Sequence, residues 1–215
     1  MDFQRARSID EKNKRLYQIK KAAITLFDTS TYQDITLSKI GEEIDFTRAN
    51  LYKYVSNKEE IYLYVLIDEL NDLVAEMETE LVRDMPLSAV DFSRAWATIL
   101  TRHPRFMKLL SILFTIIEPN ATLDALIEFK NNLQHGKQAM YGMIQHNFPS
   151  MQHEDILKLL DYAFSFIIAR YPMSYPTDKQ IEATIRSTSY YEFPAFQETF
   201  AELLTLMIGN QTAGD

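Results

Sequence analysis

Residues 36–53, TLSKIGEEIDFTRANLYK, carry the most informative pattern in this chain. Thr36 and Thr47 each precede a short run with apolar side chains at helical spacing. A threonine before a helix is a favoured N-cap, because its hydroxyl accepts a hydrogen bond from a backbone N–H that the helix leaves free. We therefore predict two short helices, at 36–44 and 47–53, with a tight turn between them, which is the helix-turn-helix pattern.

Longer helices flank this pair on both sides. Apolar residues recur every three or four positions from Asp10 to Asp28, and a second such stripe follows the cap at Ser56-Asn57. These patterns predict helices at 10–28 and 57–83. The first of these and the short pair are predicted to share one small core, made of Leu26, Phe27, Ile40, Ile44, Phe46 and Leu51.

Prolines mark the ends of the remaining helices. The chain has only 5 Gly and 7 Pro, too few for the frequent turns of a strand-rich fold. Further helices are predicted at 88–102, 104–117, 121–147, 152–171, 178–187 and 194–208, with Pro104, Pro119, Pro149, Pro172, Pro176 and Pro194 at the joints. The predicted fold class is all-α, with a three-helix DNA-binding domain at 1–58 and a helical-bundle domain at 59–215.

Charge is distributed unevenly along the chain, whose formal net charge is −8. Residues 1–58 hold 11 Lys and Arg against 8 Asp and Glu, and the remainder holds 11 against 22. The first part thus carries +3 and the rest −11. A basic head on an acidic body is the asymmetry expected when only the head meets a polyanion, so double-stranded DNA is the predicted partner of the first domain.

Side chains suited to reading DNA gather at the start of the second short helix. In the major groove, Arg48 can donate two hydrogen bonds to guanine and Asn50 can pair with adenine. Neighbouring hydroxyl and ammonium groups suit phosphate contacts, which set the register of the protein on the duplex. The predicted DNA-binding residues are Thr36, Thr47, Arg48, Ala49, Asn50, Tyr52, Lys53, Tyr54 and Lys58.

Residues 16–63 resemble the N-terminal domain of the TetR family of transcriptional regulators. The matching elements follow the family's order and spacing: Ile19 with Ala22-Ala23 and Leu26-Phe27, then Ile35-Thr36, Ile40, the run 46–55 and Asn57-Lys58-Glu59-Glu60. In the turn, Asp45 stands where the family usually has Gly, and Asp tolerates the left-handed conformation that Gly would adopt. Gly41 stands where the family prefers Ala, at a cost of roughly 1 kcal/mol in helix propensity.

The resemblance implies a body that binds a small ligand. By this resemblance the helices within 88–171 surround a cavity, and Met and aromatic side chains suit an apolar or aromatic effector. The predicted lining comprises Trp96, Phe106, Met107, Leu110, Phe114, Phe129, Met140, Tyr141, Ile144 and Phe164. All of these, and Tyr162 with them, are at core-like positions, so plain core packing is the alternative interpretation.

The resemblance also implies that the last two long helices, at 152–171 and 194–208, form a homodimer interface. The predicted interface residues are Leu160, Ile167, Phe200, Leu203, Leu204 and Met207. The expected function is a ligand-responsive transcriptional regulator, a repressor, which binds a near-palindromic operator as a homodimer and is released by its effector. An architectural DNA-binding protein without a ligand and a helical enzyme are the alternatives.

The sequence shows no pattern typical of a metal, cofactor, catalytic or membrane site. Its four histidines, His103, His135, His146 and His153, lack the spacing of metal ligands on one helix face. No phosphate-binding loop, nucleophile elbow, signal peptide or apolar run of about 18 residues occurs, and Cys is absent. We therefore expect a cytoplasmic protein without metal, cofactor or enzymatic activity.

Overall fold

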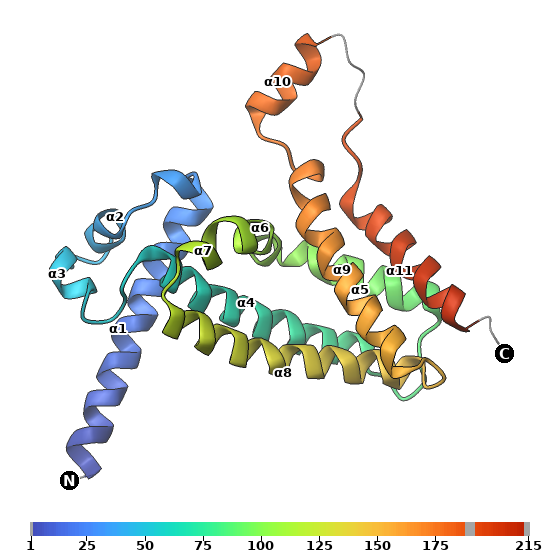
Figure 1. Cartoon of the computed structure of the whole chain (residues 1–215), viewed down its shortest axis with the longest axis horizontal. Helices are drawn as coiled ribbons and strands as arrows, with labels where there is room; N and C mark the ends of the chain where they lie inside the picture. Colours follow the sequence, from blue (N-terminus) through green and yellow to red (C-terminus); the bar gives the residue numbers. More distant parts are fainter. Residues whose placement is uncertain (1, 188–191, 213–215) are drawn as a thin grey trace. The chain divides into compact units, whose positions relative to one another are not determined.

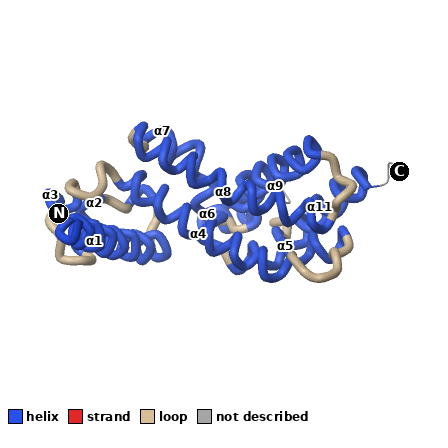
Figure 2. The backbone as a smooth tube through the Cα atoms, turned by 90° about the horizontal axis from the view of Figure 1, so that it is seen from below, coloured by secondary structure: helices blue, strands red, loops and turns tan. Residues whose placement is uncertain are grey.

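A computed structural model describes residues 2–187 and 192–212, with side chains for 11–187 and 192–209. These residues form helices joined by short loops and contain no strand (Figure 2). The predicted all-α fold class is confirmed. The chain divides into two compact units: unit 1 comprises the residues up to Asp68 together with Leu113–Asn132, and unit 2 comprises Glu69–Ile112 and the residues from Leu133 onward.

Unit 1 contains the predicted helix-turn-helix (Figure 1). The boundary between the units falls within two long helices, α4 and α8, so each contributes its first part to unit 1. The elements of unit 1 are α1 (Asp2–Thr29), a 3-10 turn (Tyr32–Asp34), α2 (Leu37–Glu42), α3 (Arg48–Leu51), the start of α4 (Lys58–Leu81), a π-helical segment η2 (Leu113–Ile117), α7 (Glu118–Asn120) and the start of α8 (Leu123–Asn147).

An aromatic cluster holds the core of unit 1 together. Phe27 of α1 packs against Tyr62 of α4 with ring centroids 5.3 Å apart, and Tyr32 lies 5.2 Å from Tyr62. Three of the predicted core residues, Phe27, Ile40 and Leu51, are buried, while Leu26, Ile44 and Phe46 are half-buried. The predicted core is confirmed in outline, and the sequence pattern missed Tyr32 and Tyr62 because both were assigned to no apolar stripe.

The tight turn between α2 and α3 depends on two residues. Asp45 has φ of 55°, and it is the one non-glycine residue at positive φ among the described residues, as its place in the family's turn predicted. Gly41 is buried, and a Cβ there would lie 2.4 Å from the carbonyl oxygen of Phe46. The absence of a side chain at Gly41 therefore makes room for the backbone at Phe46. The sequence had predicted only that this glycine lowers helix propensity, and that prediction is corrected.

Unit 2 is a layered bundle of helices. Its elements are the remainder of α4 and of α8, α5 (Ala89–Arg102), α6 (Pro104–Ile112), α9 (His153–Ser174), α10 (Asp178–Arg186) and α11 (Phe196–Thr212). Helix α11 packs against α5 and α9, and α6 packs against α9. Helix α10 stands apart from α9 and α11 in Figure 1.

Aromatic side chains and one buried amide organise the interior of unit 2. Trp96 of α5 meets Phe92 and Phe200 edge to face, with ring centroids 5.8 and 5.9 Å apart. Asn147, at the end of α8, donates to the carbonyl of Leu81 at 2.9 Å and accepts from the backbone N–H of Leu87 at 2.8 Å. Because a buried amide must find such partners, this side chain fixes the end of α4 and the loop that follows it.

Several predicted helix boundaries differ from the structure. Helix α1 begins at Asp2, eight residues before the predicted start. The segment predicted as one helix at 104–117 is α-helical to Ile112 and π-helical from Leu113 to Ile117. The spacing of apolar residues did not predict this change in the backbone hydrogen-bond pattern. Pro172 was predicted at a joint between helices, but it lies inside α9. The helix ends two residues later, at Ser174, so the proline is in its last turn.

Candidate functional site

The start of α3 has the geometry of a recognition helix. The hydroxyl of Thr47 accepts a hydrogen bond from the backbone N–H of Asn50 at 3.2 Å, and Thr36 caps α2 in the same way through Lys39 at 3.3 Å. Both predicted caps are confirmed. They fix the two short helices, which are too short to be stable alone, on either side of the Asp45 turn.

The outer face of α3 presents most of the predicted DNA-binding side chains together. Arg48, Ala49, Tyr52 and Lys53 are exposed, and Asn50 and Tyr54 are half-buried. Arg48 donates to the hydroxyl of Tyr52 through Nε at 3.0 Å and Nη2 at 2.7 Å, with its guanidinium 5.4 Å from the ring centroid. Lys53 donates to Asn50 Oδ1 at 3.2 Å. The two side chains that could read bases are thus each bonded to a neighbour, Arg48 to Tyr52 and Asn50 to Lys53.

The ammonium of Lys58, a predicted phosphate contact, is bound within unit 1. Its Nζ donates to the carbonyls of Tyr32 and Ile35, each at 2.9 Å, and lies 4.3 Å from the centroid of the Tyr32 ring. Burial lowers the pKa of Lys58, against the opposing charge of Glu59. An ammonium has three N–H donors, so one remains for a phosphate. Lys58 therefore anchors the start of α4 to the loop before α2, a role that the sequence did not reveal.

Two tyrosines near this loop, Tyr32 and Tyr62, have raised pKa values. Burial raises the pKa of Tyr32, and Glu59, which accepts from its hydroxyl at 3.2 Å, raises it further. Burial also raises the pKa of Tyr62, whose hydroxyl donates to the carbonyl of Ala23 at 3.0 Å. Each phenol therefore keeps its proton to a higher pH than a free tyrosine would, and the two hydrogen bonds tie α4 to the preceding helix and loop.

The predicted ligand-lining residues do not form one set. Phe114 and Phe129 belong to unit 1 and the others to unit 2. Buried positions comprise Trp96, Phe106, Met107, Leu110, Phe129, Met140 and Ile144, while Tyr141 and Phe164 are half-buried. Phe114 is 54% exposed and Tyr162 is 53% exposed, so the prediction that these two occupy core positions is wrong. Phe114 lies in the π-helical segment, where the altered register turns it outward.

Two buried polar atoms on α5 lack a hydrogen-bond partner among the described residues. They are the hydroxyl of Ser93 and the indole Nε1 of Trp96, which lie three residues apart on one helix face. Trp96 is the only tryptophan of the chain and was predicted to line the ligand site. An unpaired indole N–H in an apolar interior is costly, and a bound molecule with an acceptor atom would satisfy it.

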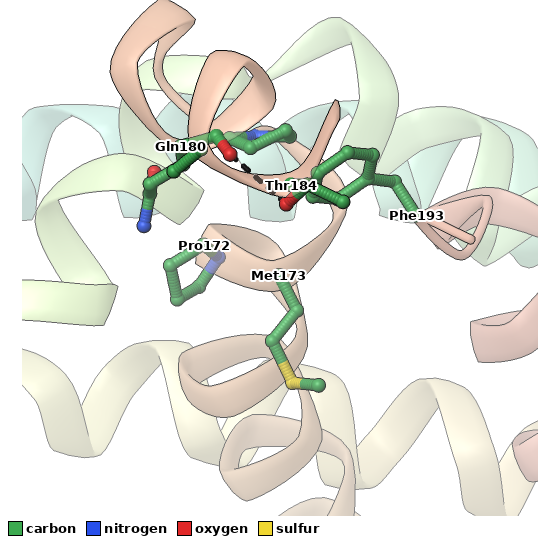
Figure 3. Close-up of a pocket in the computed structure, with 7 residues that line it drawn as sticks. Pro172, Met173, Gln180, Thr184 and Phe193 are labelled. Atoms are coloured by element: carbon green, nitrogen blue, oxygen red, sulfur yellow. Dashed lines mark hydrogen bonds between the residues drawn. The ribbon is translucent and has the colours of Figure 1, made fainter. Parts of the chain in front are cut away.

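A pocket of about 460 Å³ opens elsewhere in unit 2 (Figure 3). It lies between the end of α9, α10 and the segment before α11, and contains none of the predicted lining residues. Its lining comprises Pro172, Met173, Pro176, Gln180, Ala183, Thr184 and Phe193. The hydroxyl of Thr184 is already bonded to the carbonyl of Gln180 at 2.9 Å, so the walls offer a ligand mainly apolar contacts.

Four of the six predicted interface residues lie inside unit 2. Leu160, Ile167, Phe200 and Leu204 are buried, because α9 and α11 turn these faces toward α5, α6 and each other. Leu203 and Met207 are half-buried. The expectation that all six supply a free apolar surface is therefore corrected. Large apolar side chains that are exposed on the same two helices are Leu157, Tyr162, Met173 and Leu206.

The described residues contain no candidate metal site and no candidate membrane span. No group of three or more His, Cys, Asp and Glu side chains could hold a metal ion there. His103 pairs instead with Glu76 at 2.6 Å, and His146 meets the carbonyl of Arg83 at 2.9 Å. None of the helices in this part of the chain has the length and apolar content needed to span a bilayer.

Comparison with known proteins gives one family match and several structural neighbours. Residues 67–210 match the family model described as tetracyclin repressor-like, C-terminal domain. No curated protein sequence matches the chain.

Three solved structures share the fold. A transcriptional regulator of the TetR/AcrR family from Thermobifida fusca has a TM-score of 0.53 at 18% identity, over 92% of this chain and 97% of that one. The fatty acid degradation regulator FadR from Bacillus halodurans has a TM-score of 0.56 at 10% identity, over 90% and 94%. The FadR repressor from Thermus thermophilus, solved with lauroyl-CoA, has a TM-score of 0.55 at 18% identity, over 84% and 98%.

Proposed function

The chain belongs to the TetR family of transcriptional regulators, and from this premise we propose that it is a ligand-responsive repressor. In this proposal a homodimer binds a near-palindromic operator through α3 and its flanking residues. A small apolar molecule binds in unit 2 and releases the operator. The predicted DNA-binding domain at 1–58 and ligand-binding domain at 59–215 are part of the same proposal.

The observation that carries the proposal is the outer face of α3. Arg48 and Asn50 on α3, with Tyr52 and Lys53 directly after it, present hydrogen-bonding groups together, and Thr47 caps the first turn of α3. A guanidinium and an amide at the N-terminal end of such a helix are the groups that pair with guanine and adenine in the major groove. The Arg48–Tyr52 contact keeps the guanidinium extended along the helix before DNA arrives.

Dimerisation is supported by the apolar side chains left uncovered on α9 and α11. Leu157, Phe164 and Ile168 follow one another at spacings of seven and four residues, so they share one flank of α9. Leu157 is exposed and the other two are half-buried. On α11 the most exposed large apolar side chain is Leu206. We propose that a two-fold interface covers these residues, and a dimer that reads a near-palindromic operator needs its two copies of α3 in successive major grooves, about 34–36 Å apart.

The ligand proposal is supported by the interior of unit 2 around α5. Trp96 and Ser93 offer unpaired polar atoms within an otherwise apolar and aromatic environment. Sites for small molecules combine apolar walls with a few polar groups in this way. The Thermus thermophilus FadR neighbour was solved with lauroyl-CoA, so a long-chain acyl thioester is the first effector to test.

The chain crosses between the units at three points, two of them inside the long helices α4 and α8. The third crossing falls at Leu113, where α6 gives way to the π-helical segment. A π segment is a common site of altered register in a helix. We infer that a ligand in unit 2 biases α4 and this segment, and that a coupling of about 1–3 kcal/mol would lower operator affinity by about 5–150-fold.

Binding to DNA from the region upstream of the chain's own gene tests the proposal. The full chain should shift this DNA at concentrations that leave scrambled DNA free, and lauroyl-CoA or another long-chain acyl thioester should reverse the shift. Emission from Trp96 reports ligand binding separately, because it is the only tryptophan. Specific DNA binding that no tested ligand changes, with constant Trp96 emission, would favour an architectural DNA-binding protein over a ligand-responsive one.

A further inference from the structure

Helix α1 extends well beyond the part of unit 1 that it packs against (Figure 1). Glu11, Lys12, Asn13 and Lys14 are all exposed, and four consecutive helical positions cover every direction around the axis. The first fully covered residue is Ile19. At residues 11–14 the helix is therefore uncovered on every side, although a short helical segment that packs against nothing is marginally stable in water.

The extension leaves unit 1 beside the recognition helix. The guanidinium of Arg15 lies 5.4 Å from the centroid of the Phe46 ring, in the turn that leads directly to Thr47 and α3. Arg15 also donates to Gln18 at 3.0 Å, which holds it along α1. The face of α1 that carries Arg15 is thus the face that meets the turn next to the proposed DNA-reading surface.

Basic residues continue along this face. Lys12 precedes Arg15 by three residues, which is the spacing of one helical stripe. Lys12 and Lys14 are exposed, and the structure records no ion pair for either among its described side chains. Lys14 is displaced from the stripe by two residues, so it points away from it.

We propose that the extension of α1 is a second DNA contact, which lies along the phosphate backbone flanking each half-site through the stripe of Lys12 and Arg15. The inference rests on the proposed function, because it requires α3 to dock in the major groove. Phosphates are the partner that an exposed cation without an acidic partner, such as Lys12, recognises. At 1.5 Å per residue, residues 2–14 span about 20 Å, or about six base pairs of duplex.

The salt dependence of operator binding tests this contact. Lys12→Gln should reduce the slope of log affinity against log salt by about 0.9, the value for one phosphate contact. Its affinity deficit relative to wild type should therefore shrink by about 3.5-fold between 50 and 200 mM salt. The matched control is Lys14→Gln, which removes the same charge from the other side of the same helix and should leave the slope unchanged.

Duplex length gives an independent readout. Wild-type affinity should fall when about six base pairs are removed from each side of the operator, and Lys12→Gln should then bind as tightly as wild type. Equal slopes for wild type, Lys12→Gln and Lys14→Gln, together with a large loss for Arg48→Ala, would overturn the flanking contact and leave the proposed function standing. Absence of specific DNA binding by the wild type would overturn both.

Discussion

The two units differ in whether their buried polar side-chain atoms have hydrogen-bond partners. In unit 1 the hydroxyls of Tyr32 and Tyr62 and the ammonium of Lys58 each have hydrogen-bond partners, at 3.2, 3.0 and 2.9 Å. The buried side-chain atoms without a partner, among the described residues, are those of Ser93, Trp96 and Ser174, all in unit 2. Unit 1 thus has the fixed geometry needed to read DNA, while unit 2 keeps polar atoms that a bound molecule could satisfy.

The largest effect is expected at the surface of α3. Arg48→Ala should weaken operator binding by about 1–3 kcal/mol and relax discrimination at one base pair, because a bidentate contact to guanine is lost. Fluorescence anisotropy with operator and with single-base variants measures both. Arg94→Ala in unit 2, also exposed, is the control and should bind as wild type does. Equal losses in the two variants would contradict base reading by Arg48.

The turn between α2 and α3 comes next. Gly41→Ala places a methyl group 2.4 Å from the Phe46 carbonyl oxygen, so we expect a loss of about 1–3 kcal/mol in the free energy of unfolding. Gly142→Ala is the matched control, because no atom lies within 4 Å of its added Cβ and helix propensity alone should stabilise by up to about 1 kcal/mol. Urea unfolding of both variants gives the comparison, and a stabilising Gly41→Ala would remove the steric role of this glycine.

A smaller effect is expected from a paired hydroxyl of unit 1. Tyr62→Phe removes the hydrogen bond to the carbonyl of Ala23 and should lower the free energy of unfolding by about 0.5–1.5 kcal/mol. The phenyl ring keeps its contacts with Phe27 and Tyr32, so the change isolates the hydroxyl. Unchanged stability would mean that unit 1 does not depend on its paired polar atoms.

The smallest effect is expected from an unpaired hydroxyl of unit 2. Ser93→Ala removes a buried oxygen without a partner, so the free energy of unfolding should stay within about 0.5 kcal/mol of wild type or rise. The same denaturation measurement used for Tyr62→Phe applies. A loss as large as that of Tyr62→Phe would show that the hydroxyl is satisfied in solution and would erase the contrast between the units.

The sequence predicted unit 1 more closely than unit 2 because different physical signals define them. Caps at Thr36 and Thr47 and the left-handed residue Asp45 are local features, which residue type and spacing report directly. The need for Gly41 and the anchoring of Lys58 depend on atoms brought close by the folded turn, so the sequence did not reveal them.

In unit 2 the spacing of apolar residues and the positions of the prolines predicted where the helices lie in the sequence. They did not predict which helices pack against one another. Periodicity marks a face as apolar without saying whether the same chain or a partner covers it. The family resemblance assigned Phe200 and Leu204 to a dimer surface, although α5 and α9 cover them. Phe114 failed for another reason, since a π-helical segment breaks the 3.6-residue repeat on which its core placement depended.

Footprinting of the full chain on the DNA upstream of its own gene tests the central claim most directly. If two copies of α3 read a near-palindromic operator, two protected half-sites should appear with centres about one helical turn, or a multiple of it, apart. Arg48→Ala should need a higher protein concentration than wild type to protect the two half-sites, and by the same factor for both. A single protected half-site, or protection by Arg48→Ala at the wild-type concentration, would contradict a dimeric regulator that reads DNA through this helix.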